Sequence, residues 1–475
     1  MSSILASKSK IPLQLKVFHT LLGIVVFFSL ITIPAERHSI LFSGIETTSD
    51  MLWWPFVFTG LYLIHRIYGF GYFRHSVYLV IFFRICYLLF LQLAIWLPSS
   101  SFWTMQETYT HVLGRDIQYM ILSSVEFWGC SMVLIKLLSP ANNILSKMGF
   151  FISLISFTTL DHLLIHNQNN NFEQSFIVLA LIFSFLMILV KPLTKLIIDI
   201  EKFQPKDKDY SLFKISAPLQ QKDQHNIFKY HHILFCSSIV FFIASKTMAA
   251  KFISIGFVTI NAGGIVFSLA YLASDIMTDV YGIERTKQMI FFVIFANLLF
   301  VFDIWLSNLL AVNANGGFQH IFHNQARIFL ASGVAFFLGM TINSTVISMI
   351  KARQRKRGIS LKKEFITTVW ARVATSSSFG IILDVSLFSL VAFFGVVPHD
   401  KLASIVIFED VYKISYEVLL APVSVLLIYA LKVTEKIDIY DKIDNLNPFK
   451  VNTNYQANAN KFYENYIQNV RRNDD

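Results

Sequence analysis

The sequence predicts an all-α integral membrane protein with about twelve transmembrane helices in two six-helix halves. Of its 475 residues, 55% are hydrophobic and 15% are charged, and its mean hydropathy is +0.55. Soluble domains carry about 25% charged residues. The 47 Phe lie mostly in long apolar runs without turn signals. Runs of about 18 residues or more are long enough to cross a bilayer as helices, and they are too continuous for barrel strands.

Hydropathy predicts six spans in each half. The spans of the first half cover 17–34, 51–68, 77–97, 117–138, 148–165 and 175–198. The spans of the second half cover 232–250, 255–273, 288–312, 326–350, 365–397 and 403–431. We expect the first span to remain uncleaved, because its apolar run is long and no small-residue cleavage site follows it.

The loops predict the orientation and the domain boundaries. Lys and Arg gather in alternate loops, which is the positive-inside pattern and predicts that both termini are cytoplasmic. We therefore divide the chain into a six-helix membrane domain of unknown role at 1–200, a polar cytoplasmic linker at 201–230, a second six-helix domain at 231–441 and a cytoplasmic tail at 442–475. Tyr68-Gly69 loosely echoes Tyr281-Gly282, but the flanking match needs gaps, so an internal repeat stays an open hypothesis.

Charge and cysteine usage exclude several classes of protein. The net charge of +10 comes from loops on one side of the membrane, so no folded basic face is available to bind nucleic acid. The three Cys lie in apolar runs, which argues against a disulfide framework. No nucleotide-binding Gly-rich motif is present, so we expect that the chain itself does not hydrolyse ATP. We also expect no cofactor and no enzyme activity.

The second half holds an unusual number of polar residues at membrane depth. They are Lys246, Asp275, Asp279, Asp303, Asn343, Arg372, Asp384, Lys413 and Glu417. Such residues are costly in lipid and mark a pathway or site by default. The alternative is that they form structural ion pairs, or that Asp279 is a solvated helix end.

Helical spacing suggests which of these groups meet. Asp275 and Asp279 are four residues apart and share one helix face, and Lys413 and Glu417 have the same spacing and could pair. Asp384 has no local partner and needs a tertiary one, for which Lys413 or Lys246 would serve.

The first half also has ionisable side chains within its predicted spans. Arg84 and Glu126 are expected to form a structural pair, and Asp161 ends the fifth span. His162 and His166 have a spacing that binds metal or haem, but surface polar residues are the better interpretation.

In order and spacing, residues 232–441 resemble the vitamin uptake transporter family, whose members are queuosine-precursor transporters of bacteria. The resemblance rests on Tyr271, Ser274-Asp275, Asp279-Val280-Tyr281-Gly282, Gly339, Gly380, Asp384, Lys413, Tyr416-Glu417-Val418-Leu419-Leu420 and Pro422. Family members usually have Gln at Met340, an acid at Asn343, Asn at Lys246 and Glu at Asp279. These differences concern the identity of the substrate and leave the fold assignment unchanged.

The resemblance implies import of a 7-deazaguanine-type base across the bacterial inner membrane by secondary active transport. The expected substrate-binding residues are Asp275, Asp384, Lys413, Glu417, Tyr271, Tyr416, Asn343 and Lys246. The candidates for carrying a coupling proton are Asp384, Glu417 and Asp279. The implied partners are a small heterocycle and the lipid bilayer. The alternatives are a membrane enzyme or regulatory scaffold fused to a transporter-like domain, or import of another nucleobase or vitamin.

Overall fold

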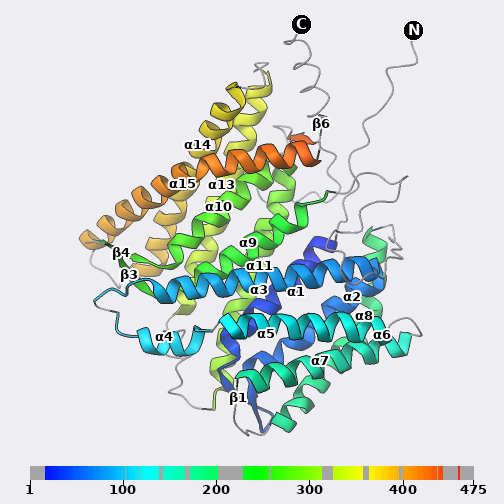
Figure 1. Ribbon diagram of the computed structural model, residues 1–475. Coiled ribbons are helices and arrows are strands. Elements are labelled where there is room, and N and C mark those ends of the chain that lie inside the picture. The colour runs from blue at the N-terminus through cyan, green and yellow to red at the C-terminus, as the bar shows by residue number, and fades with distance from the viewer. Residues whose placement is uncertain are drawn as a thin grey trace, which may run out of the picture.

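The computed structural model describes residues 17–101, 103–115, 117–138, 143–165, 172–201, 228–255, 258–312, 325–356, 363–394, 399–435, 437–441 and 458–460. Most of the predicted linker and most of the predicted tail lie outside these ranges. Nine of the described helices are long and apolar enough to cross a membrane, which confirms a helical multi-pass membrane protein. Figure 1 shows the helices running roughly alongside one another in two stacked groups.

The elements of the first half follow the predicted order with one added hairpin. They are α1 (Phe18–Ala35), β1 (Ser39–Phe42), β2 (Ile45–Thr48), a short 3₁₀ turn (Ser49–Leu52), α2 (Trp54–Tyr68), α3 (Phe70–Trp96), α4 (Gln106–Leu113), α5 (Ile117–Trp128), a π-helical turn (Gly129–Leu134), α6 (Ile135–Leu138), α7 (Asn143–Ile165) and α8 (Phe172–Glu201). The π-turn interrupts the span predicted at 117–138, and α2 has only 15 residues. The predicted count of twelve spans is therefore not confirmed.

The second half repeats this order. Its elements are α9 (His231–Met248), β3 (Phe252–Ile255), β4 (Val258–Asn261), α10 (Gly263–Tyr281), α11 (Ile283–Leu310), α13 (Gln325–Lys356), α14 (Lys363–Phe393), α15 (His399–Glu435), β5 (Asp438–Tyr440) and β6 (Asn458–Asn460). The span predicted at 255–273 starts too early, because Phe252–Ile255 and Val258–Asn261 pair as the antiparallel strands β3 and β4. Buried Ile253 and Ile260 pair across that hairpin, so its apolar residues look like membrane span in a hydropathy scan.

Two glycines mark the same joint in each half. Gly69 joins α2 to α3 with φ 93° and ψ 178°, and Gly282 joins α10 to α11 with φ 87° and ψ 164°. This backbone region is essentially restricted to glycine. The two glycines are 213 positions apart, and the same offset relates Phe18 to His231 and Ser39 to Phe252, where α1 and α9 and then β1 and β3 begin.

In each half, a glutamate at the end of the last long helix makes the same two hydrogen bonds to the rest of that half. The hydroxyl of Tyr68 donates a 2.7 Å hydrogen bond to Glu201 at the end of α8, and the hydroxyl of Tyr281 donates a 2.8 Å bond to Glu435 at the end of α15. Each glutamate also accepts the backbone N–H just before the first helix of its half, at 2.8 Å. The echo of Tyr68 and Tyr281 in the sequence therefore corresponds to equivalent places in the fold.

The two halves contact each other reciprocally at their hairpins. Val312 N donates to Ser39 O at 3.3 Å, and Ser100 N donates to Phe252 O at 3.0 Å, so each hairpin bonds to the chain after the long helix of the other half. Lys251 adds a 2.8 Å bond from its ammonium to Ala94 O. Helices α1 and α9 pack together between these contacts, as the middle of Figure 1 shows. Reciprocal contacts of this kind are those of a twofold interface.

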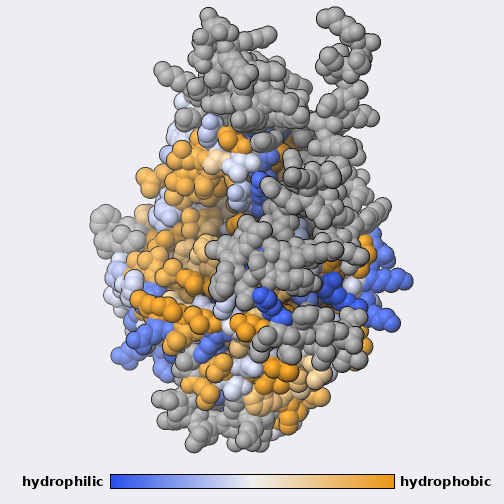
Figure 2. Space-filling model, turned by 45° about the vertical axis from the view of Figure 1, so that its right-hand side comes forward, coloured by the Kyte–Doolittle hydropathy of each residue, from blue (hydrophilic) through white to orange (hydrophobic). Residues whose placement is uncertain are grey.

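The surface fits a lipid environment. Figure 2 shows broad hydrophobic areas on one face of the molecule. Large apolar side chains are exposed on the long helices, for example Trp96 on α3, Ile188 on α8 and Leu419 on α15, which are 72%, 73% and 73% exposed. Large exposed apolar patches are unusual on soluble proteins, whereas the bilayer covers them at no cost.

Candidate substrate-binding site

A cavity lies among α9, β4, α10, α13, α14 and α15, at the end of the second half where its hairpin lies. We call this end the hairpin end, and the opposite end, where Gly282 lies, the glycine end. The volume of the cavity is about 60 Å³, which is room for roughly four waters. Asn261 shapes its floor, because its side chain bonds to Ala249 O at 3.0 Å and accepts the N–H of Gly263 at 2.7 Å.

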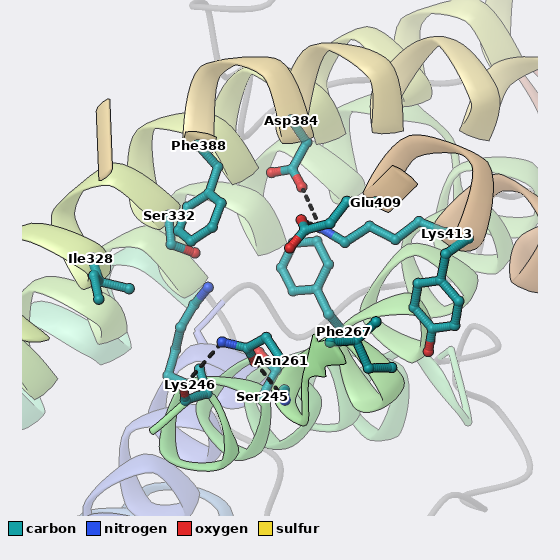
Figure 3. Close-up of a pocket in the computed structure, with 15 residues that line it drawn as sticks. Ser245, Lys246, Asn261, Phe267, Ile328, Ser332, Asp384, Phe388, Glu409 and Lys413 are labelled. Atoms are coloured by element: carbon teal, nitrogen blue, oxygen red, sulfur yellow. Dashed lines mark hydrogen bonds and ion pairs between the residues drawn. The ribbon is translucent and has the colours of Figure 1, made fainter. Parts of the chain in front are cut away.

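Two lysines and two carboxylates face this cavity (Figure 3). Lys413 pairs with Asp384 at 3.9 Å and with Glu409 at 3.5 Å. Lys246 reaches in from α9. Its buried ammonium contacts no carboxylate within 4 Å among the described residues. It lies instead 4.6 Å from the centre of the Phe242 ring and 5.0 Å from that of Phe267, and Lys413 lies 5.3 Å from the Phe267 ring. The Lys246 ammonium is thus available to an acceptor on a ligand.

A second polar layer lies deeper and is fully buried. Asp275 accepts hydrogen bonds from Asn343 at 2.6 Å and from Ser377 at 2.9 Å. Both oxygens of Glu417 lack a hydrogen-bond partner among the described residues, as does the hydroxyl of Tyr271. Buried polar groups are rarely left unsatisfied, and such exceptions occur at functional sites.

Two glycines bring helices close above this layer. A Cβ atom added to Gly339 on α13 would lie 2.6 Å from the hydroxyl of Tyr271 and 2.8 Å from the carbonyl of Gly380 on α14. Glycine at these positions therefore allows α13 and α14 to cross closely over Tyr271.

Asp279 lies in an ion cluster at the glycine end. Its carboxylate contacts Arg372 and lies 2.5 Å from the ammonium of Lys432 and 3.8 Å from that of Lys351. Asp438 pairs with the same two lysines at 2.8 and 2.7 Å. Burial alone would raise the pKa of Asp438, but the two ammonium groups hold it below its ordinary value. The cluster ties α10, α13, α14 and α15 together.

The structure brings some of the expected site residues together and separates others. Lys246, Asp384 and Lys413 line the cavity, and the predicted tertiary partnership between Lys413 and Asp384 is confirmed. The alternative pairing of Lys413 with Glu417 does not form. Lys413 instead pairs with Glu409, which is four residues away in the other direction along α15.

The remaining expected residues lie around the cavity. Tyr271, Asp275, Asn343 and Glu417 form the deeper layer, and Asp279 belongs to the ion cluster. Tyr416 is half-buried and stacks on Tyr412, a cavity-lining ring whose centre lies 6.3 Å away. Sequence reasoning missed Glu409, Asn261 and Phe388, which also line the cavity. The helical spacing of Glu409 from Lys413 was the signal that could have found the first of them.

The described residues contain no group of three or more His, Cys, Asp or Glu side chains placed to hold a metal. The positive charges in this site are the ammonium groups of Lys246 and Lys413. The cavity can therefore offer a ligand acceptors, donors and an aromatic face.

A sequence profile described as "Putative vitamin uptake transporter" matches residues 48–151 and 261–427, which together are more than half of the chain. The chain belongs to this family. The match confirms the resemblance of the second half and extends it into the first half, where the sequence alone indicated none. No curated protein and no solved structure matches the chain.

The two matched segments begin at Thr48 and Asn261, the last residues of the two equivalent hairpins. These positions are 213 apart, the same offset as that between the two joint glycines. The vitamin uptake transporter profile thus finds both halves of the chain at corresponding points.

Proposed function

We propose that this protein imports a queuosine precursor of the 7-deazaguanine type by secondary active transport. The cavity among Lys246, Phe267, Asp384 and Lys413 is the observation that carries the proposal. It presents an aromatic face, an available ammonium and carboxylates within a small enclosed space, in a chain that belongs to a transporter family.

The chemistry of the base matches these groups. A guanine-like edge has two adjacent N–H donors, which one carboxylate accepts together, as it does from an arginine. Asp384 is placed to do so, because its contact with Lys413 is long, at 3.9 Å. The carbonyl oxygen of the base is an acceptor for the ammonium of Lys246. Phe267 offers a face on which the heterocycle stacks.

Alternating access follows from the two ends of the second half. Helices α10, α13, α14 and α15 all contribute to the cavity at the hairpin end and to the Asp279 cluster at the glycine end. The positive-inside pattern supports an orientation with the hairpin end outside and the glycine end in the cytoplasm. Release to the cytoplasm then requires these four helices to separate at the cluster, so the ion pairs act as the inner gate.

Asp384, Glu417 and Asp279 remain the candidates for carrying a coupling proton. Glu417 is the strongest of the three, because neither of its buried oxygens has a hydrogen-bond partner among the described residues. A carboxylate without fixed donors is suited to exchanging a proton during transport, whereas Asp279 is held by three cations.

A second candidate is import of another small heterocycle, such as a vitamin. The description of the family favours it, and so does Lys246, whose ammonium would equally donate to a carboxylate or carbonyl on such a ligand. The cavity offers no feature that favours the membrane-enzyme or scaffold alternatives.

The test is uptake by bacterial cells that cannot make the deazaguanine precursor, with queuosine in tRNA as the readout. Cells expressing the full chain should recover queuosine, and Asp384→Asn should reduce uptake at least about tenfold, because it loses a charged hydrogen-bond acceptor. Asp199→Asn is the matched control, since Asp199 is exposed on α8. Absence of uptake by well-expressed full chain would refute the substrate. Uptake of labelled vitamins in the same cells would then identify the second candidate.

A further inference from the structure

We propose that the first half is a copy of the second whose own site is filled by its side chains, so that each chain binds a single substrate molecule. The inference explains a region to which the sequence assigned no role. It rests on the proposed function for the identity of the substrate, but not for the filling of the first site.

The aromatic floor of the site is present in both halves. Trp54 on α2 lies 213 positions before Phe267 on α10, at the corresponding place in the repeat. The guanidinium of Arg84 lies 5.0 Å from the centre of the Trp54 ring, just as the ammonium of Lys246 lies 5.0 Å from that of Phe267. The two cations come from different helices, α3 and α9, but each lies over the equivalent ring.

The side chains around this ring differ in size between the halves. In the second half the cavity is lined by the small residues Ala249 and Gly263. At the same offset of 213, the first half has the larger residues Glu36 and Asp50. Arg115 and Tyr119, just before and at the start of α5, both contact Glu36. Larger side chains therefore gather at the corresponding place in the first half.

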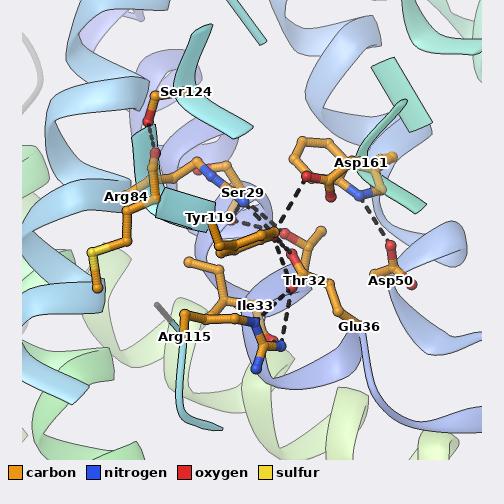
Figure 4. Close-up of polar contacts among 12 residues, drawn as sticks. Ser29, Thr32, Ile33, Glu36, Asp50, Arg84, Arg115, Tyr119, Ser124 and Asp161 are labelled. Carbon is orange, nitrogen blue, oxygen red and sulfur yellow. Dashed lines mark hydrogen bonds and ion pairs between the residues drawn. The ribbon is translucent and has the colours of Figure 1, made fainter. Parts of the chain in front are cut away.

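Three of these side chains, Glu36, Arg115 and Tyr119, bond to one another, and Asp50 accepts the indole N–H of Trp54 at 3.2 Å (Figure 4). Arg115 pairs with Glu36 at 3.0 Å and donates to Ile33 O at 3.0 Å. Tyr119 donates to Glu36 at 3.0 Å and to Asp161 at 3.4 Å. The predicted pairing of Arg84 with Glu126 is wrong, because Arg84 turns to this cluster instead. A network of partnered charges is stable only while it stays complete, so it holds the site closed.

Arg84 is the clearest case of a side chain that occupies the site of the first half. Its guanidinium donates to Ser29 O at 2.5 Å and to Thr32 at 2.9 Å, and lies 3.6 Å from Glu36. A guanidinium is planar, stacks on an aromatic face and donates paired hydrogen bonds. These are the properties by which the amino edge of a guanine-like base would bind Phe267 and Asp384. In the first half the guanidinium of Arg84 thus takes the place that a ligand would occupy.

The first test is the number of binding sites. Equilibrium binding of the labelled deazaguanine base to purified full chain should give one site per chain, and Asp384→Asn should abolish it, with Asp199→Asn as the control. Two sites per chain, or one site surviving in Asp384→Asn, would overturn the proposal. If the unmodified protein binds no base, the proposed substrate has failed, and the second test decides.

The second test needs no substrate. Arg84→Ala should empty a guanidinium-sized space over Trp54, lower the melting temperature, and allow ethylguanidinium at low millimolar concentration to restore it saturably. Arg327→Ala is the control, because Arg327 is exposed and bonds to Val391 O and Phe394 O at the protein surface. If Arg84→Ala is not recovered, Arg84→Lys is measured in the same way.

Saturable restoration confined to the Arg84 variants would support a filled site. Equal responses of the Arg84 and Arg327 variants, or no restoration in either, would overturn it. Because this readout is thermal, its failure is distinguishable from failure of the proposed substrate.

Discussion

Asp279→Asn is the sharpest test of the inner gate. Asp279 and Asp438 together face Lys351, Lys432 and Arg372, all of them buried. Removing the charge of Asp279 leaves one carboxylate among three cations. Breaking a buried ion pair by removing one partner costs about 3–5 kcal/mol. We therefore expect Asp279→Asn to lower the free energy of unfolding by about that amount.

Arg372→Gln is the matched control, because it leaves two carboxylates facing two cations. Its cost should be smaller, about 1–3 kcal/mol, as for loss of a hydrogen bond to a charged group. Unfolding can be followed in detergent with a thiol-reactive dye, since the three cysteines are free and at least partly buried. Equal stability of Asp279→Asn and the unmodified protein, or a larger loss in Arg372→Gln, would refute the reasoning.

Four further substitutions test a joint glycine, the hydrogen bonds that close each half and the close helix crossing, with Gly44→Ala as a control. Gly282→Ala places a Cβ atom 3.0 Å from a carboxylate oxygen of the chain after α15 and imposes a disfavoured backbone, so it should cost about 1–3 kcal/mol. Gly44→Ala, whose added atom meets nothing within 4 Å, should cost less in the same melting assay. Tyr281→Phe and Tyr68→Phe should each cost about 1.5–3 kcal/mol, because each loses a hydrogen bond to a glutamate, and unequal losses would contradict their equivalence. Gly339→Ala should cost about 1–3 kcal/mol through overpacking against a backbone carbonyl of α14 and should reduce uptake; unchanged melting and uptake would contradict the close crossing.

Helix positions were predictable from the sequence, whereas the hairpins were not. The ends of α1 and α9 fall within about two residues of the predicted spans, because apolar length alone determines them. The β3–β4 hairpin was mistaken for the start of a span. Its buried Ile253 and Ile260 have the same hydropathy as helix residues, and only their pairing across strands distinguishes them.

The charged residues of the candidate site and the pairing of Asp384 with Lys413 were predictable from the sequence, but the partner of Lys413 along its own helix was not. Lys246 and Asp384 were identifiable because ionisable groups at membrane depth are rare. The sequence could not show whether Lys413 pairs with Glu409 or with Glu417, since both lie four residues away on the same helix and tertiary packing decides between them. The repeat was visible only at Tyr68-Gly69 and Tyr281-Gly282, because the site residues that would have revealed it differ in size and charge between the halves.

The reciprocal docking of the hairpins has a consequence for biosynthesis. Ser39 and Ala94 meet their partners only after Val312 and Lys251 have been made, more than 150 residues later. During translation the first half therefore enters the membrane with one flank uncovered, and α9, the next described helix to be synthesised, is the one that covers α1. A ribosome stalled between the halves would leave that flank open to lipid, to chaperones or to the first half of another chain.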